Sequence, residues 1–265
     1  MQHHVIVSFG RDKEFEYRVI GGTPPDEARQ WFSREFAALE CDVASPTGKI
    51  LAVDRILSVA KYAGEGRFRD QITPVEIKTR KGMVAFDTDE HVRGDVSLEA
   101  LGNMKAVFQK GGTVTPGNAS GLNDGAAAVV LMEATRAATL GVKPLARLVG
   151  YAHAGVEPAY MGIGPVPATR LVLQRTGLRI EDLDVIEANE AFAAQACAVS
   201  QELGLDPAKV NPNGSGISLG HPVGATGAII TTKAIAELHR TGGRYALVTM
   251  CIGGGQGIAA IFERI

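Results

Sequence analysis

Alternation of strand and helix patterns over residues 136–265 is the feature that most limits how this chain can fold. Short apolar runs typical of strands recur between longer segments whose apolar residues have helical spacing. Such alternation predicts a layered α/β domain, and its ending in two consecutive strands favours a mixed central sheet. We expect strands over residues 145–153, 184–188, 245–250 and 257–264, and helices over residues 166–176, 190–205 and directly after His221.

The rest of the chain divides into two further regions. Residues 1–66 predict a small α+β unit, in which a hairpin over residues 4–20 precedes two amphipathic helices, the second over residues 50–63. We expect these helices to cover the hairpin, because a lone hairpin is only marginally stable. Residues 67–135 predict a connector that ends in a buried strand over residues 126–132. Within the connector we expect short strands over residues 72–78 and 82–89 and a helix over residues 98–109.

A glycine-rich stretch, residues 211–227, holds a histidine just before a predicted helix. Pro222 follows His221 and fits the first turn of that helix, where a missing N–H costs nothing. Cys251 lies at the end of an apolar strand pattern and precedes a run of glycines. A histidine can shuttle a proton, a thiol can give or take one, and N–H groups around glycines can hold an oxyanion. Because strand ends and helix starts meet at one edge of such a sheet, we expect Asn189, His221 and Cys251 to converge there for acyl chemistry. The alternative for each residue alone is a structural role.

Composition excludes several classes of function. A formal net charge of −2 gives no general attraction to nucleic acid or to an anionic membrane. No apolar run reaches the length of a membrane span, and the first residues predict a strand rather than a signal peptide. The cysteines, Cys41, Cys197 and Cys251, are odd in number and widely spaced, which argues against disulfides and zinc and predicts a reducing cytoplasm. Cys41 lies between two carboxylates, which raise the pKa of a thiol, so we expect it to be inert.

Several motifs resemble those of the thiolases and follow one another in the order of that family. NEAF at residues 189–192, GHP at residues 220–222 and CIGGG at residues 251–255 resemble three of its catalytic loops. The supporting runs are NASGLNDGAAAVV, MGIGPVPATR and VNPNGSGISLGHPVGATG, at residues 118–130, 161–170 and 210–227. The resemblance extends from about residue 69 to residue 265 and is to bacterial biosynthetic β-ketothiolases of the acetyl-CoA acetyltransferase type. It implies a thiolase-like layered C-terminal domain with a mixed sheet.

The resemblance implies an acyltransferase that joins or splits acyl groups at the β-keto carbon of a coenzyme A thioester. In the family an N-terminal cysteine becomes acylated, and the histidine of GHP, here His221, would activate that cysteine and help to bind the thioester oxygen. The asparagine of NEAF, here Asn189, would hold a water that completes this oxyanion site. The cysteine of the last loop, here Cys251, would move the α-proton, and the backbone of Gly253 would donate to a second oxyanion hole. We expect the donor-rich setting near His221 to lower the pKa of the Cys251 thiol.

The resemblance also implies contacts with coenzyme A. Ser120 matches a serine that touches the pantetheine arm, and Arg93 matches a basic residue near the nucleotide end. Phe108, Met161 and Phe192 match apolar walls of the pantetheine tunnel, with core packing as the alternative for these three. The coenzyme A thioester is then a substrate, and no permanently bound cofactor is expected. The implied partners are this acyl-CoA and either a second copy of the chain or a thiolase N-terminal half, with no nucleic acid or membrane.

One feature of the thiolases has no counterpart in this sequence. The family brings its acylated cysteine in a Cys-Gly-Ser-Gly-like loop, and the sequence contains no such loop. Residues 1–66 do not resemble the half of a thiolase that carries it, so we expect an unrelated segment in its place. Three interpretations remain open: an acyltransferase that is impaired or depends on a partner for its nucleophile, a catalytically inactive truncated thiolase, or a module that binds coenzyme A or another protein.

Overall fold

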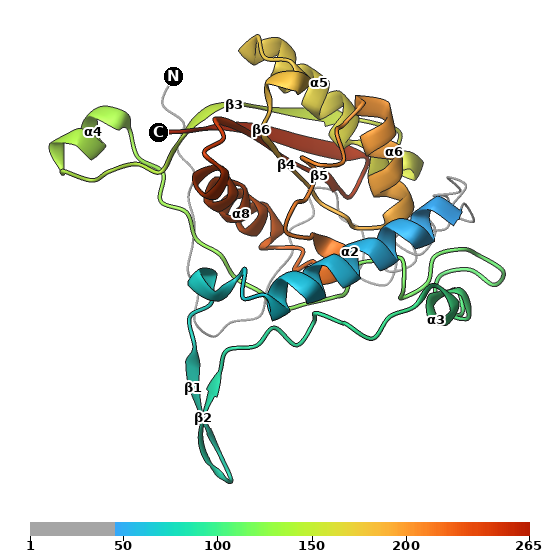
Figure 1. Ribbon diagram of the computed structural model, residues 1–265. Coiled ribbons are helices and arrows are strands. Elements are labelled where there is room, and N and C mark those ends of the chain that lie inside the picture. Colours follow the sequence, from blue (N-terminus) through green and yellow to red (C-terminus); the bar gives the residue numbers. More distant parts are fainter. Residues whose placement is uncertain (1–45) are drawn as a thin grey trace, which may run out of the picture.

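The computed structural model describes residues 46–265, which run from helix α2 (Pro46–Gly64) to strand β6 (Gln256–Arg264) (Figure 1). The predicted hairpin over residues 4–20, the first of the two predicted amphipathic helices and Cys41 lie outside these residues. Within the described part, short 3₁₀ helices occupy three connections: η1 (Arg69–Gln71), η2 (Pro158–Ile163) and η3 (Ile180–Asp182). No helix in this part is long and apolar enough to cross a membrane.

A four-stranded mixed sheet lies at the centre, in the order β3–β6–β5–β4. Strands β3 (Ala146–Gly155) and β5 (Tyr245–Ile252) both pair antiparallel with β6, whereas β4 (Val185–Ala188) runs parallel to β5. The turn between β5 and β6 needs glycine, because Gly254 and Gly255 have φ angles of 83° and 82°. The predicted mixed sheet is confirmed, and the observed strands begin and end within two residues of the predicted positions.

Helices cover both faces of this sheet. Helices α5 (Pro165–Thr176) and α8 (Thr226–Thr241) lie on opposite faces (Figure 1). Successive residues of β5 point alternately to the two sides, so Leu247 packs with the α5 side and Val248 with the α8 side. Helix α8 meets the sheet along one apolar face whose residues recur every fourth position: Ile230, Ala234 and Leu238. The predicted layered α/β class is therefore confirmed.

Helix α2 packs on this same body. Its buried Ala52 and Ile56 form a cluster with residues of α3 (Leu98–Gly102), α6 (Ala193–Leu203) and α7 (Gly216–Leu219). The sequence predicted this helix correctly but assigned its apolar face to the hairpin of residues 4–20. The structure instead buries that face against helices that follow it in the chain. Apolar spacing identifies which face of a helix is covered and leaves the covering element undetermined.

Strands β1 (Val75–Thr79) and β2 (Gly82–Phe86) form an antiparallel hairpin that projects from the body (Figure 1). Every residue of the two strands is exposed. The two short strands predicted in the connector are thus confirmed, with shifted ends. The helix predicted over residues 98–109 is shorter, since α3 ends at Gly102.

The prediction of a buried strand over residues 126–132 is wrong. These residues precede α4 (Ala134–Thr139), form no strand, and most of them are exposed, with Val130 at 87% and Leu131 at 54%. A continuous apolar run forms a buried strand only where neighbouring strands pair with it and helices cover it. Neither described sheet includes this run, so its apolar side chains face outward.

Candidate active site

His221 lies in the loop between α7 and α8, pressed against the segment that contains Asn123. Its backbone N–H donates to Oδ1 of Asn123 at 3.2 Å, and a β-bridge joins it to Leu122. Gly220 has a φ angle of 91°, and a Cβ at this position would lie 2.4 Å from Oδ1 of Asn123. The glycine in front of the histidine is therefore required by both backbone conformation and close approach.

The imidazole of His221 has a polar neighbour on each nitrogen. Its Nδ1 lies 2.6 Å from Oγ1 of Thr226, and its Nε2 lies 3.3 Å from Nδ2 of Asn189. Burial lowers the pKa of His221, so the neutral imidazole prevails at neutral pH. A neutral imidazole carries a lone pair on its unprotonated nitrogen and can act as a general base.

Asn189 is fixed directly after β4. Its backbone N–H donates to the carbonyl of Thr249 in β5 at 3.0 Å, and the residue is only 2% exposed. Its Oδ1 has no hydrogen-bond partner among the described residues. Buried polar atoms are normally paired, so this oxygen marks a place where water or a substrate group can bind.

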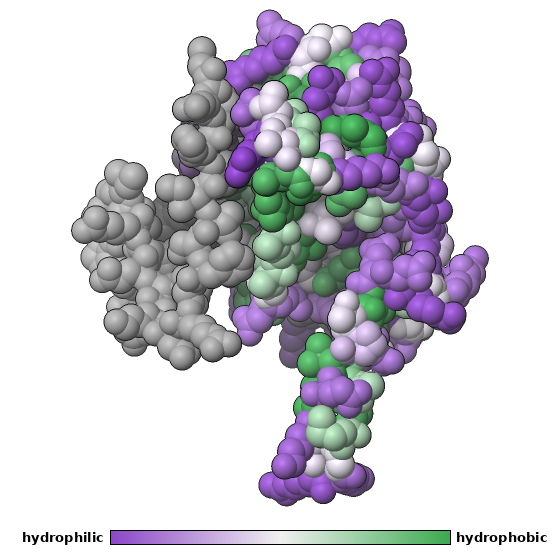
Figure 2. All heavy atoms as spheres, turned by 90° about the vertical axis from the view of Figure 1, so that its left-hand side faces the viewer, coloured by the Kyte–Doolittle hydropathy of each residue, from purple (hydrophilic) through white to green (hydrophobic). Residues whose placement is uncertain are grey.

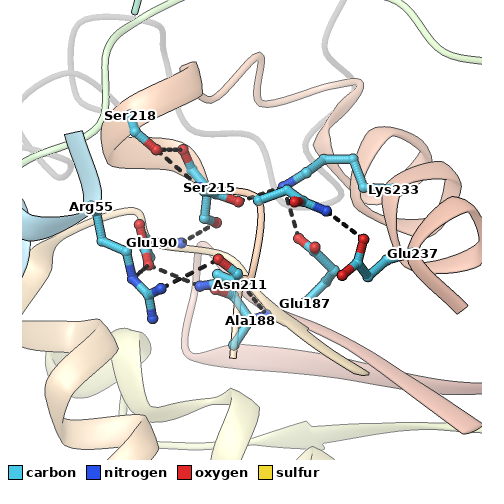
Figure 3. A network of polar contacts seen from close by, with 11 residues as sticks. Arg55, Glu187, Ala188, Glu190, Asn211, Ser215, Ser218, Lys233 and Glu237 are labelled. Atoms are coloured by element: carbon cyan, nitrogen blue, oxygen red, sulfur yellow. Dashed lines mark hydrogen bonds and ion pairs between the residues drawn. The ribbon is translucent and has the colours of Figure 1, made fainter. Parts of the chain in front are cut away.

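A buried network holds Ala188 and Glu190, the chain neighbours of Asn189 (Figure 3). Nε of Arg55 lies 3.2 Å from the Glu190 carboxylate, which also accepts from Nδ2 of Asn211 at 2.9 Å. Asn211 pairs in addition with the backbone of Ala188, accepting its N–H at 2.9 Å and donating to its carbonyl at 2.8 Å. Asn211 holds this position with a φ angle of 47°, a conformation in which asparagine is one of the tolerated residues. Arg55 of α2 is thereby tied to the loop that carries Asn189.

A second buried ion pair joins Glu187, two residues before Asn189, to Lys233 (Figure 3). Nζ of Lys233 in α8 lies 2.9 Å from the carboxylate of Glu187, which is fully buried, and also donates to the carbonyl of Gly214. Burial raises the pKa of both Glu187 and Glu190, and the neighbouring cations Lys233 and Arg55 oppose this effect. The two ion pairs therefore brace Asn189 from α8 and from α2.

Cys251 lies in β5, two residues beyond the Thr249 carbonyl that Asn189 contacts. It is 8% exposed, and burial raises the pKa of its thiol to about 11. The expected lowering of this pKa is wrong, because the strand end buries the sulfur and no cation of residues 46–265 opposes the effect of burial. A thiol of this kind is protonated at neutral pH, and its thiolate is a strong base once formed.

An apolar wall lies next to Cys251. Cys251 shares a cluster with Met161 and Ala191, and Phe192 packs against it. The rings of Phe108 and Phe192 meet edge to face with centroids 6.3 Å apart. The structure thus brings together the three residues predicted to line a pantetheine tunnel, in an arrangement that also suits core packing.

Ser120 lies beside this wall, since its backbone N–H donates to the carbonyl of Ala191 at 2.9 Å. Gly253 follows Cys251 by two residues, in the exposed β5–β6 turn. Arg93 is held in an exposed loop by an ion pair with Asp95 at 3.0 Å. Ser120 and Gly253 therefore lie at the site that contains Cys251, whereas the observed interactions of Arg93 stay within its own loop.

Sequence reasoning missed several residues that shape this site. Thr226 and Asn123, which contact the side chain and backbone of His221, lie within the quoted motifs but were assigned no role. Nδ2 of Asn123 also lies 3.2 Å from Nδ1 of His91. Thr226, Asn123 and His91 line a cavity of about 270 Å³ that reaches Asn189 and Lys233. The available signal was a hydroxyl residue five positions after the histidine, at the start of the predicted helix.

Two family models match the chain. The model described as "Thiolase, C-terminal domain" matches residues 142–264, and that described as "Thiolase, N-terminal domain" matches residues 51–135. The chain belongs to the thiolase family. The N-terminal match shows that the unrelated segment expected over residues 1–66 is wrong for residues 51–66, which are thiolase sequence. Helix α2, with its Arg55 contact to the loop that carries Asn189, lies largely within this match.

Curated thiolases align with most of this chain. It is 64% identical to the β-ketothiolase BktB of Cupriavidus necator over 232 residues, which are 87% of this chain and 59% of the relative. It is 51% identical to an acetyl-CoA acetyltransferase of Shinella zoogloeoides over 201 residues, which are 76% of this chain and 51% of the relative. The chain therefore spans between half and three fifths of the length of these relatives.

Solved thiolase structures share the fold. A Bacillus anthracis acetyl-CoA acetyltransferase superposes with a TM-score of 0.81 at 46% identity, covering 89% of this chain and 60% of that structure. Human mitochondrial 3-ketoacyl-CoA thiolase superposes with a TM-score of 0.78 at 39% identity, covering 88% of this chain and 59% of that structure. The thiolase-like layered fold expected from the motifs is thus confirmed.

Proposed function

We propose that this chain provides the proton-transfer and oxyanion-binding part of a thiolase-type acyl transfer on acyl-CoA and 3-ketoacyl-CoA thioesters. The observation that carries the proposal is the 3.3 Å contact between Nε2 of His221 and Nδ2 of Asn189, beside the strand that bears Cys251. Membership of the thiolase family and the names of the relatives support it. Thiolases act on coenzyme A thioesters as substrates and need no resident cofactor.

The residues divide the chemistry in a way that suits their environments. Neutral His221 takes the proton of a thiol that attacks the thioester carbonyl, and its Nε2–H then faces the oxygen that becomes negative. As the first thioester is cleaved, the departing coenzyme A thiolate takes the proton of the Cys251 thiol, whose pKa is about 11. The Cys251 thiolate formed in this way then takes the α-proton of a second acetyl group. The resulting enolate carbon attacks the acylated thiol, so a carbon–carbon bond forms and a carbon–sulfur bond breaks, and the released sulfur takes back the proton held by His221. Asn189 holds a water that completes the first oxyanion site, and the Gly253 backbone donates to the oxyanion of the second.

The apolar wall supports binding of the pantetheine arm beside Cys251. In this proposal the arm lies against Phe108, Met161 and Phe192, with Ser120 as a polar contact. Arg93 lies in a separate exposed loop, which suits the phosphorylated nucleotide end of coenzyme A. Such a division, apolar along the arm and basic at the phosphates, is how ligands with apolar and charged parts are commonly bound.

The cytoplasmic location of this protein remains a prediction from the cysteine pattern.

We infer that full turnover depends on a second polypeptide, which supplies the acylated cysteine. The sequence has no Cys-Gly-Ser-Gly-like loop, and covalent catalysis requires a residue that carries the acyl group while Cys251 moves a proton. The partner that fits is the N-terminal part of a thiolase, because in the family this part carries the acylated cysteine in a Cys-Gly-Ser-Gly-like loop.

The outward-facing apolar run over residues 126–132 offers this partner a surface. The described backbone hydrogen bonds include no pairing of this run with a neighbouring strand. Figure 2, which views the side of the molecule where this segment runs towards α4, shows apolar atoms gathered above the projecting β1–β2 hairpin. An extended apolar segment with unpaired N–H and C=O groups is suited to accept another strand.

Proton exchange tests the proposal without needing turnover. The purified chain is incubated with acetyl-CoA in D₂O, and deuterium in the acetyl group is measured by mass spectrometry. We expect slow exchange that Cys251→Ala abolishes and Cys197→Ala leaves unchanged. Binding of coenzyme A without any exchange would contradict the proposal and favour a binding module. If the chain shows no binding of coenzyme A and no exchange, the proposal is contradicted and a catalytically inactive truncated thiolase is favoured.

A further inference from the structure

We propose that Thr226 is a positioning residue that fixes the proton of neutral His221 on Nδ1 and leaves the lone pair on Nε2. The inference deepens the proposed function and rests on it for its catalytic meaning. Thr226 is the first residue of α8 and is 2% exposed, so its side chain cannot turn to solvent. Its chemistry is therefore set by the groups around it.

The Thr226 hydroxyl has one hydrogen and two polar neighbours, so its hydrogen bonds determine which ring nitrogen of His221 is protonated. Oγ1 of Thr226 lies 2.9 Å from the carbonyl of Pro222, which can only accept. A hydroxyl has a single hydrogen, so donation to Pro222 leaves Oγ1 as an acceptor for its other neighbour. That neighbour is Nδ1 of His221 at 2.6 Å, which must then carry the hydrogen.

Asn189 independently favours the same tautomer through the other ring nitrogen, Nε2. Nε2 of His221 faces Nδ2 of Asn189 at 3.3 Å, and an amide nitrogen can only donate. Nε2 therefore has to accept, which is possible in the neutral ring only when the proton lies on Nδ1. The opposite tautomer would set two N–H groups against each other and would require Thr226 to give up its bond to Pro222.

This tautomer has a direct consequence for the reaction. A lone pair on Nε2 is directed towards Asn189, where the thiol and thioester of the proposed reaction would lie. His221 can then accept a proton at Nε2 without first rotating its ring or losing the proton on Nδ1. Thr226 acts through His221 and needs no contact with the substrate, which distinguishes it from a catalytic residue.

Nitrogen-15 NMR of the full chain tests the inference, because the shifts of the two ring nitrogens report the tautomer. The resonances of His221 are assigned by their loss in His221→Gln, at a pH above its titration. We expect a protonated-type shift at Nδ1 and an unprotonated-type shift at Nε2. In Thr226→Val the proton on Nδ1 loses its acceptor while Asn189 still faces Nε2, so we expect a measurable part of the population to move its proton to Nε2. In Thr226→Ser we expect the original pattern to return.

Thr231→Val is the matched control, because Oγ1 of Thr231 in the same helix donates to the carbonyl of Gly227 at 2.8 Å and has no observed contact with a histidine. It should leave the shifts of His221 unchanged. A wild-type spectrum with the proton on Nε2, or an unchanged pattern in a folded Thr226→Val chain, would overturn the inference. If Thr226→Val does not fold, the wild-type and Thr226→Ser spectra still decide it. The readout needs no turnover, so an inactive chain with the expected tautomer would refute only the proposed function.

Discussion

Nδ2 of Asn189 lies 3.3 Å from Nε2 of His221, although the two residues are 32 positions apart in the chain. Asn189 follows a strand of the central sheet, and His221 lies in the loop before the helix that covers one face of that sheet. Their contact joins two of the thiolase loops in one polar site. The structure therefore gives a physical basis to motifs that the sequence shows only as separate strings.

Removal of the Asn189 amide should impair catalysis while the fold remains. In the chain reconstituted with a thiolase N-terminal half, Asn189→Ala should lower kcat by about 10²–10³, because one preorganised donor at an oxyanion site is lost. Thiolysis of acetoacetyl-CoA measures the effect. The exposed Asn103→Ala serves as the control, and equal rates for both variants would exclude Asn189 from the reaction.

Cys251 should be unreactive at neutral pH. A thiol with a pKa of about 11 is ionised at pH 7 in only about one molecule in 10⁴. The rate of its alkylation by iodoacetamide, followed by peptide mass spectrometry, should rise about tenfold per pH unit between pH 7.5 and 9.5. The sign follows from the raised pKa, because only the thiolate reacts. A rate that levels off below pH 8 would show that the site activates this thiol.

Loss of Arg55 should destabilise the fold strongly. Arg55→Ala leaves the Glu190 carboxylate, which is 1% exposed, without its cation, and such a change typically costs about 3–5 kcal/mol. Urea denaturation gives the free energy of unfolding. Arg170→Ala is the control, since the Arg170–Glu202 pair is 59% exposed on each side and should contribute less than about 1 kcal/mol. Similar losses for the two variants would mean that burial of the Arg55 pair has no energetic importance.

The apolar run over residues 126–132 should be needed for association with the N-terminal half. Val130→Asp places a charge on a side chain that is 87% exposed, so the chain itself should stay folded while binding weakens at least tenfold. Calorimetric titration with the N-terminal half of the Cupriavidus necator relative measures this. Val142→Asp, at an exposed valine outside the run, should bind normally, and normal binding by Val130→Asp would place the interface elsewhere.

Local patterns determined much of the fold in advance. The alternation after residue 136 predicted the strands, the covering helices and the mixed sheet, because strand and helix periods differ clearly when one side is buried. The motifs around Asn189, His221 and Cys251 predicted a shared site, because strand ends and helix starts meet at one edge of such a sheet. Direct reach between His221 and Cys251 stays a prediction.

What the sequence could not supply depended on neighbours far apart in the chain. The run at residues 126–132 has the composition of a buried strand, but burial requires other strands beside it. The glycines around Cys251 suggested an activated thiol, whereas the absence of a nearby cation in the described residues lets burial raise its pKa. The contacts of Thr226 became visible only when the start of α8 was placed against the imidazole.

Thiolysis of acetoacetyl-CoA by the purified chain, alone and mixed with the N-terminal half of the Cupriavidus necator relative, tests the central claim most directly. We predict that the chain alone gives almost no acetyl-CoA. We predict that the mixture turns over and that either His221→Ala or Cys251→Ala in this chain abolishes the reaction. Robust thiolysis by the chain alone, unaffected by Cys41→Ala and by Cys251→Ala, would contradict the account.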